Sequence, residues 1–207
     1  MTELLVGLRD RGLDTSRPIF VGIDGAKALR AAVTRVFDHP VIGRCQLHKV
    51  RNVADRLPDH LAATVAKRMR AAYHAESALV AEAQLKALAT ELDRTHPGAA
   101  ASLREGMAET LTVLRLGVPP TLARTLRSTN SIESMISIAR THSRNVTNWQ
   151  NGTMALRWCA AGMVEAGKQF RRVNGHLHLP ALRDALDRHI AAHNVSTSRQ
   201  NEPVIAA

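Results

Sequence analysis

The first quarter of the chain alternates between two patterns of hydrophobic and polar positions. Residues 2–11 read as a short helix, and the unbroken apolar run at 18–23, rich in β-branched residues, is typical of a strand buried on both faces. Apolar positions at helical spacing follow over 29–37. A second short apolar run at 41–45 precedes a basic helix over 46–56. This alternating order predicts a parallel α/β sheet.

The pattern changes after residue 57. Between 58 and 118 no segment has the pattern of a strand, and Ala, Leu, Glu, Arg and Lys dominate the composition. We expect three or four helices there, separated by breaks near Ser77 and at Pro97-Gly98. The stretch is therefore predicted to be an all-helical insertion, which Pro119-Pro120 closes.

The last part of the chain is predicted to be helical again. An apolar stripe from Ile132 to Ala139 marks one helix, and a longer helix is expected over 152–173. Five residues of the longer helix are predicted to face inward: Leu156, Cys159, Met163, Ala166 and Phe170. A final helix is expected around Leu186, ahead of a polar tail.

Charge and composition narrow the choice of partners. The chain has 28 Lys and Arg against 18 Asp and Glu, a formal net charge of +10, which favours a polyanionic partner; non-specific stickiness or ribosomal association would look the same at this level. Aromatics are only 3%, so a base-stacking platform is disfavoured and contact with a duplex backbone is preferred. No secretory segment and no apolar run of about 18–20 residues is present. We expect a cytoplasmic protein, associated with the nucleoid and not with membranes, in which both cysteines are free thiols.

Asp24 is the first candidate for chemistry. It follows the predicted strand at 18–23 and precedes Gly25 and a helix. Ligands of parallel α/β sheets bind outside the carboxyl ends of the strands, where such a carboxylate would project. The alternative is that Asp24 caps the next helix while Gly25 makes the turn.

Glu133 is the second candidate. Asn130 with Glu133 three positions later matches a capping box, which is a structural role. However, Glu133, Ser137, Arg140 and Arg144 are expected to share one helix face. A carboxylate followed by arginines suits a site that holds a cation beside a phosphodiester.

Cys45-x-x-His48 has the spacing of half a zinc site. A structural zinc needs four ligands, and no suitable second pair follows, so a packing and hydrogen-bonding role is the preferred interpretation. His48 also begins a basic set with Lys49, Arg51 and Arg56. Taken alone, such a set is usually a solvated helix face.

Three motifs in order resemble the Mutator-type transposases of bacterial insertion sequences. They are Ile23-Asp24-Gly25, the segment from Arg44 to Asn52 with its Cys45-x-x-His48, and the segment from Ser128 to Ser134 around Glu133. The resemblance covers residues 17 to 190, nearly the whole chain. It implies a DDE catalytic triad on an RNase H-like fold, with Asp24 as the second carboxylate and Glu133 as the third.

The resemblance also implies a division of the chain. An RNase H-like part at 1–57 is followed by the helical insertion at 58–118, a second RNase H-like part with the Glu-bearing helix at 119–193, and a flexible tail at 194–207. The family's first catalytic Asp lies on a strand upstream of the second, and no acid before Asp24 follows a buried strand. We therefore expect an α/β, RNase H-like fold that is N-terminally incomplete, and a chain that does not cleave or join transposon ends by itself.

The implied chemistry is hydrolysis of a phosphodiester followed by strand transfer. Carboxylates in such sites hold two Mg²⁺ ions, one for the attacking oxygen and one for the leaving oxygen. Asp24 and Glu133 are expected to converge in space and, without a third carboxylate, to bind metal weakly. The implied partners are double-stranded DNA at insertion-sequence ends and targets, and either further copies of the chain or an intact transposase. The phosphate contacts are expected from four residues: Lys49, Arg51, Arg140 and Arg144.

Two other functions compete with this one. The chain could be a non-catalytic DNA-binding remnant that modulates an intact transposase, or a basic helical binding module without catalytic ancestry. An in-frame strand ending in Asp, encoded upstream of Met1, would favour the enzyme. A stop codon or frameshift there would favour the remnant.

Overall fold

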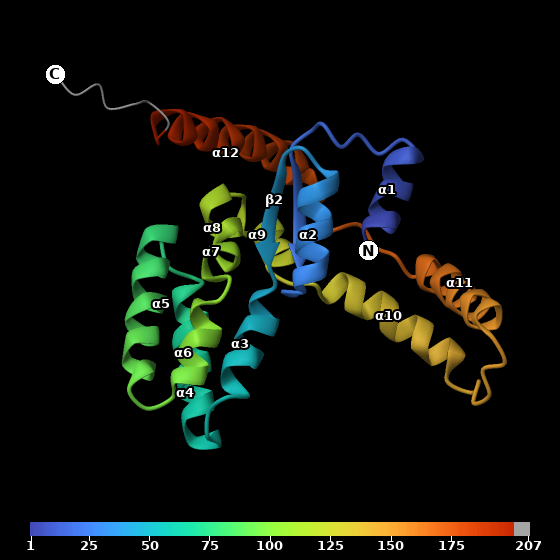
Figure 1. The fold of residues 1–207 in the computed structure, drawn as a ribbon, viewed down its shortest axis with the longest axis horizontal. Coiled ribbons are helices and arrows are strands. Elements are labelled where there is room, and N and C mark those ends of the chain that lie inside the picture. The colour runs from blue at the N-terminus through green and yellow to red at the C-terminus, as the bar shows by residue number, and fades with distance from the viewer. Residues whose placement is uncertain (201–207) are drawn as a thin grey trace. The chain divides into compact units, whose positions relative to one another are not determined.

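The computed structural model describes the backbone of residues 1–200 and the side chains of residues 1–192. The chain divides into two compact units. We call Met1–Ser128 with Gly175–Ala207 the sheet unit, and Thr129–Asn174 the hairpin unit. Figure 1 labels most helices and strands of both units. Among the described residues, no helix is both long enough and apolar enough to cross a membrane.

The sheet unit contains a parallel pair of strands. β1 (Ile19–Ile23) and β2 (Pro40–Arg44) pair in a register that places Ile19 opposite Pro40 and Ile23 opposite Arg44. α2 (Lys27–Val36) connects them and buries Val33 against the strands, and α1 (Thr2–Asp10) packs against α2. The predicted order of strand, helix, strand and helix in a parallel α/β arrangement is confirmed.

The helical insertion follows α3 (Gln46–Ala54). It consists of α4 (Asp59–Ala72), α5 (Ala78–Asp93), α6 (Pro97–Arg104), α7 (Met107–Thr110) and α8 (Thr112–Leu116). Both predicted breaks are confirmed, because Ser77 caps α5 by accepting from the Val80 N–H at 3.2 Å and Pro97 opens α6. Residues 58–118 thus form five helices instead of three or four. The reason is that Gly106, with φ of +64°, turns the chain before the two short helices.

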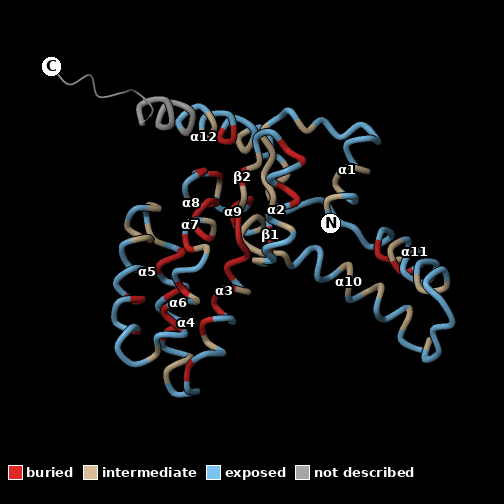
Figure 2. Tube along the Cα trace, viewed as in Figure 1, coloured by how far each residue is buried: buried red, intermediate tan, exposed pale blue. Residues whose placement is uncertain are grey.

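The largest hydrophobic core lies among α3, α4, α5 and α6. Met69, Leu85, Leu88 and Leu103 are almost completely buried there, and Figure 2 shows buried segments along these helices. Full burial of one such side chain contributes about 1.5–3 kcal/mol. The insertion therefore has a core of its own inside the sheet unit.

A second core cluster joins β2 to the end of the unit. Val41, Leu116, Leu122 and Leu186 are buried in it. Leu122 comes from α9 (Pro120–Leu126), which begins at the proline pair predicted to close the insertion. Leu186 comes from α12 (Leu179–Gln200), which follows the short 3-10 helix η1 (His176–His178). α12 continues past residue 194, where the flexible tail was predicted, and residues 201–207 of that tail lie outside those described.

The hairpin unit consists of two helices, α10 (Asn130–Ser143) and α11 (Gly152–Lys168). They pack closely at Gly162, where an added Cβ would lie 2.8 Å from the Cα of Ala139. Five residues of α11 were predicted to face inward. Of these, Ala166 is buried and Met163 half-buried, but Leu156, Cys159 and Phe170 are exposed, so the prediction is wrong for these three. A single partner helix can cover only one narrow stripe of α11.

Candidate functional site

Asp24 lies directly after β1, at the carboxyl end of the parallel strands. Its Oδ1 accepts a hydrogen bond of 3.0 Å from the backbone N–H of Ala26, and Gly25 turns the chain with φ of +113°. The turn predicted at Gly25 is confirmed, but Asp24 does not cap α2, because the N-cap of that helix is Ala26 and no side chain makes a cap hydrogen bond there. The Asp24 side chain is exposed, at the sheet edge where parallel α/β proteins bind ligands.

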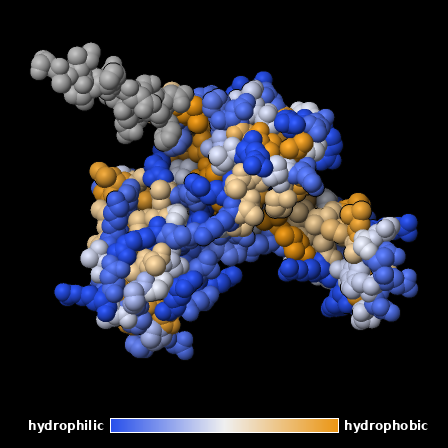
Figure 3. All heavy atoms as spheres, viewed as in Figure 1, coloured by the Kyte–Doolittle hydropathy of each residue, from blue (hydrophilic) through white to orange (hydrophobic). Residues whose placement is uncertain are grey.

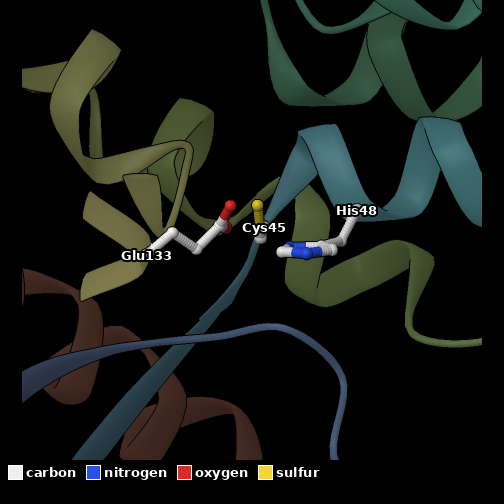
Figure 4. A group of neighbouring side chains, drawn as sticks. All are labelled: Cys45, His48 and Glu133. Carbon is white, nitrogen blue, oxygen red and sulfur yellow. The ribbon is translucent and has the colours of Figure 1, made fainter. Parts of the chain in front are cut away.

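Cys45 and His48 come from the same edge of the sheet. The Cys45 N–H donates to the carbonyl of Ile23 at 2.7 Å, which extends the strand pairing to the residue just before Asp24. Cys45 is buried at the N-terminus of α3, and half-buried His48 lies in the first turn of that helix (Figure 4). Backbone pairing thus brings the first two sequence motifs together.

A network of ion pairs ties this edge to the helical insertion. The guanidinium of Arg44, at the end of β2, contacts Glu105 at 2.6 Å and Glu109 at 3.1 Å. Glu109 also pairs with Arg30 of α2 at 2.5 Å. Arg44 is buried, so these carboxylates compensate a charge that would be costly alone. The network holds the ends of β2 and α2 against α7.

Lys49 belongs to the same network and not to an exposed basic face. Its side chain is 1% exposed, and Nζ donates to the carbonyls of Ser102 at 2.7 Å and Glu105 at 2.5 Å, and to the Glu105 carboxylate at 3.0 Å. Arg51, in contrast, is exposed. The burial of Lys49 argues against the predicted DNA contact, since a phosphate cannot reach a side chain enclosed by its own protein.

Glu105 is the acid that the two buried cations, Arg44 and Lys49, share. Hydrogen bonds from Arg44, and then from Lys49, lower the pKa of Glu105 to about 2 against the opposing effect of burial. Burial lowers the pKa of Lys49, while the hydrogen bond and charge of Glu105 oppose this shift. Glu105 is therefore ionised at neutral pH and compensates the cations of β2 and α3.

Glu133 lies in the first turn of α10 in the hairpin unit, and its side chain is drawn in Figure 4. Its Oε1 accepts a hydrogen bond of 2.7 Å from the Thr129 hydroxyl. Thr129, not Asn130, is the N-cap of α10, and it makes no side-chain cap bond, so the predicted capping box is wrong. Glu133 is exposed, so its carboxylate is accessible to a ligand. The approach of Glu133 to Asp24 stays a prediction.

Arg140 and Arg144 follow Glu133 along the same segment. Both are exposed, and Arg144 is the C-cap of α10. The predicted face with one carboxylate and two arginines is therefore accessible to a ligand. Such a face can attract a phosphate through the arginines while the carboxylate offers oxygen ligands.

Comparison with known proteins identifies the family to which these motifs belong. The model of the family described as "Transposase, Mutator family" matches residues 1–173. The chain belongs to the Mutator family of transposases. This match includes Asp24, the Cys45–His48 segment and Glu133, the three motifs on which the resemblance rested.

Three curated relatives of this Mutator-family chain are insertion-sequence transposases. The transposase for insertion sequence element IST2 of Acidithiobacillus ferrooxidans is 28% identical, over 70% of this chain and 48% of the relative. The transposase for insertion sequence element ISRM5 of Rhizobium meliloti is 28% identical, over 88% of this chain and 45% of the relative. A probable insertion-sequence transposase of Corynebacterium diphtheriae is 31% identical, over 72% of this chain and 43% of the relative. The chain thus spans less than half the length of these relatives.

The two tryptophans are candidate functional residues that composition argued against. Trp149 and Trp158 are the only tryptophans in the sequence, and both lie in the hairpin unit with substantial exposure, 46% and 38%. Because tryptophans are so few, composition disfavoured base stacking. Their separation by nine positions was the signal in the sequence that both lie in one short segment.

Proposed function

We propose that this chain supplies two carboxylates, Asp24 and Glu133, to the active site of a DDE transposase with an RNase H-like catalytic fold. The reaction is cleavage of DNA at the ends of an insertion sequence and transfer of the cut strand to a target. The observation that carries the proposal is Asp24, exposed at the carboxyl end of a parallel strand in a chain of the Mutator family. A carboxylate at that edge is placed to bind a ligand of the sheet.

The chemistry of the two side chains fits Mg²⁺. Both are exposed carboxylates. Asp24 accepts a local hydrogen bond from the Ala26 N–H, and Glu133 accepts one from the Thr129 hydroxyl. Oxygen is the ligand type that Mg²⁺ prefers, and the hydrogen bonds limit the orientations of the carboxylates. Bound metal ions would activate the attacking oxygen and stabilise the leaving oxygen. Asp24 and Glu133 would hold these ions and so position the phosphodiester.

A test of metal binding uses the chain itself. With Fe²⁺ in place of Mg²⁺, added hydrogen peroxide is reduced at the bound iron to hydroxyl radicals, which cut the nearby backbone, and ascorbate returns the iron to Fe²⁺. We expect cuts close to both Asp24 and Glu133, suppressed by excess Mg²⁺ and reduced by Asp24→Asn or Glu133→Gln. Asp38→Asn and Glu76→Gln change exposed carboxylates elsewhere and should leave the cuts intact. Cuts at only one of the two positions would contradict a shared metal site.

A test of activity uses a chimera, because the chain spans less than half of its relatives. This chain replaces the matching segment of the ISRM5 transposase, and cleavage of a labelled ISRM5 end is measured with Mg²⁺ or Mn²⁺. Asp24→Asn and Glu133→Gln should each abolish cleavage while DNA binding persists. A chimera that still cuts after either substitution would refute the assignment of that carboxylate.

Duplex DNA is the proposed substrate, bound chiefly through its phosphates. The net charge of +10 and the exposed Arg51, Arg140 and Arg144 support this. Log affinity should fall with log salt by about 0.9 per neutralised phosphate. Arg140→Ala and Arg144→Ala should each reduce that slope by about 1 without changing sequence preference. Lys67→Ala, an exposed cation of α4, is the matched control, and a flat salt response of the unaltered chain would contradict the proposal.

A further inference from the structure

A cavity of about 490 Å³ opens in the hairpin unit where the loop after α10 enters α11. Its lining residues are Gln150, Asn151, Thr153, Met154, Arg157 and Trp158. Asn151 fixes one wall, because its Oδ1 accepts the Met154 N–H at 2.8 Å and so caps α11. The volume lies within the range of about 300–1,000 Å³ that small-molecule sites occupy.

The lining combines an aromatic face with polar and cationic groups. Trp158 keeps 38% of its surface exposed, and Arg157 is exposed beside it. Gln150 and Thr153 add an amide and a hydroxyl that can donate and accept hydrogen bonds. Figure 3 shows apolar side chains at the surface over α11, next to hydrophilic ones. This mixture differs from a purely apolar face that another protein would cover.

The charge of the hairpin unit indicates an anionic ligand. Residues 129–174 contain six Lys and Arg against two Glu, an excess of four positive charges. Both tryptophans of the chain lie in this strongly basic segment. A nucleotide meets all of these features, because its base stacks on an aromatic ring, its base edge forms hydrogen bonds and its phosphate attracts an arginine.

We propose that this cavity binds one unstacked nucleotide of the DNA substrate, with the base on Trp158 and the phosphate near Arg157. Bases inside a duplex are covered on both faces by their neighbours, so only an unpaired or extruded base can reach the indole. Every base offers a π-face, and binding should therefore tolerate any sequence. This inference rests on the proposed function, in which DNA is the substrate.

The test compares three labelled DNAs of equal duplex length. One is a blunt duplex, the second carries a short single-stranded overhang, and the third carries the same overhang with abasic sites, which keeps the phosphates and removes the bases. The 207-residue chain should bind the overhang about tenfold more tightly than either other DNA, since stacking of one base supplies an effect of that size. In a Trp149→Phe variant, Trp158 is the remaining indole, and its fluorescence should be quenched by the overhang alone.

Variants separate the base contact from general DNA binding. Trp158→Ala should lose the preference for the overhang and keep the affinity for the blunt duplex, whereas Trp158→Phe should keep most of the preference. Leu156→Ala changes a side chain of α11 that is 70% exposed and outside the cavity lining, and should alter neither. Circular dichroism verifies that each variant keeps its helices.

The possible results distinguish this inference from the proposed function. Equal affinity for the blunt duplex and the overhang, or a preference that survives Trp158→Ala, overturns the nucleotide site alone. Equal preference for the intact and abasic overhangs also overturns it, because a site for phosphates would then explain the binding. Absence of binding to all three DNAs contradicts both the nucleotide site and the proposed DNA substrate.

Discussion

α5 of the insertion and α10 of the hairpin unit are helices of similar length, but they differ in how many of their side chains are buried. α5 has 16 residues and buries Ala81, Leu85, Leu88, Ala89 and Leu92. α10 has 14 residues and buries none. α5 packs against α4 and α6, whereas within its unit α10 has one partner helix, α11. The number of neighbours therefore decides how much of an apolar stripe becomes a core.

Stability and ligand contacts come from different regions of this protein. The insertion gains its stability from side chains that no ligand can reach. The hairpin unit keeps Glu133, Arg140, Trp149 and Trp158 exposed, and its two helices pack closely at Gly162. Exposed charges and aromatics contribute little to folding, but they are the groups that contact nucleic acid.

The largest expected effect is loss of a buried leucine from the insertion. Leu85→Ala removes a side chain with 0% exposure and should lower the free energy of unfolding by about 2–5 kcal/mol, because it leaves a cavity. Leu156→Ala makes the same chemical change at a position of α11 that is 70% exposed. It should change the free energy of unfolding by less than about 0.5 kcal/mol. Urea unfolding followed by circular dichroism measures both. Equal losses of stability would mean that Leu85 of α5 and Leu156 of α11 contribute equally to folding, which would contradict the difference in burial.

The next effect concerns the close approach inside the hairpin unit. Gly162→Ala forces a Cβ against the backbone of Ala139 and should destabilise the unit by about 1–3 kcal/mol. Gly167→Ala lies on the same helix in open space and should stabilise it by up to about 1 kcal/mol, since Ala favours helix more than Gly does. Both tryptophans lie in this unit, so their fluorescence during urea unfolding reports on it alone. A Gly162→Ala hairpin as stable as the unaltered one would refute tight packing there.

The smallest effect is a pH dependence restricted to the sheet unit. The pKa of Glu105 falls from 4.5 to about 2 on folding, so its ionised form stabilises the fold above about pH 4.5, and this contribution is lost as the pH falls towards 2. The side chain is half exposed, so the loss should be about 1 kcal/mol or less. Glu105→Gln should remove this part of the acid dependence, measured as urea midpoints from pH 7 to pH 2. Tryptophan fluorescence, which follows the hairpin unit, should show no such difference between the two proteins.

Local spacing explains why much of the fold could be predicted. The strands at 19–23 and 40–44, their parallel pairing and the breaks at Ser77 and Pro97 follow from apolar runs and from residues that stop helices. Asp24 could be placed at a strand end for the same reason. The family motifs around Cys45 and Glu133 could likewise be recognised without coordinates, because each lies in one short segment of sequence.

Packing between distant segments could not be predicted in this way. Lys49 belongs to a run of basic residues and looks solvated, yet a contact with Glu105, 56 positions later, buries it. Leu156 and Phe170 have helical spacing and look like core residues, yet no partner within the hairpin unit covers them. In both cases periodicity identifies one face of a helix but not what lies opposite it.

The sequence by itself determined the strand pair, most of the helices, the family and the identity of the candidate carboxylates, because these depend on residues near one another in the chain. Only the tertiary structure decided that Arg44 and Lys49 serve a buried ion network while Arg140 and Arg144 stay exposed. It also decided that Arg157 and Trp158 line one cavity. The physical reason is that burial and side-chain contact depend on which distant segment packs against a residue, and that information is not present in its local pattern.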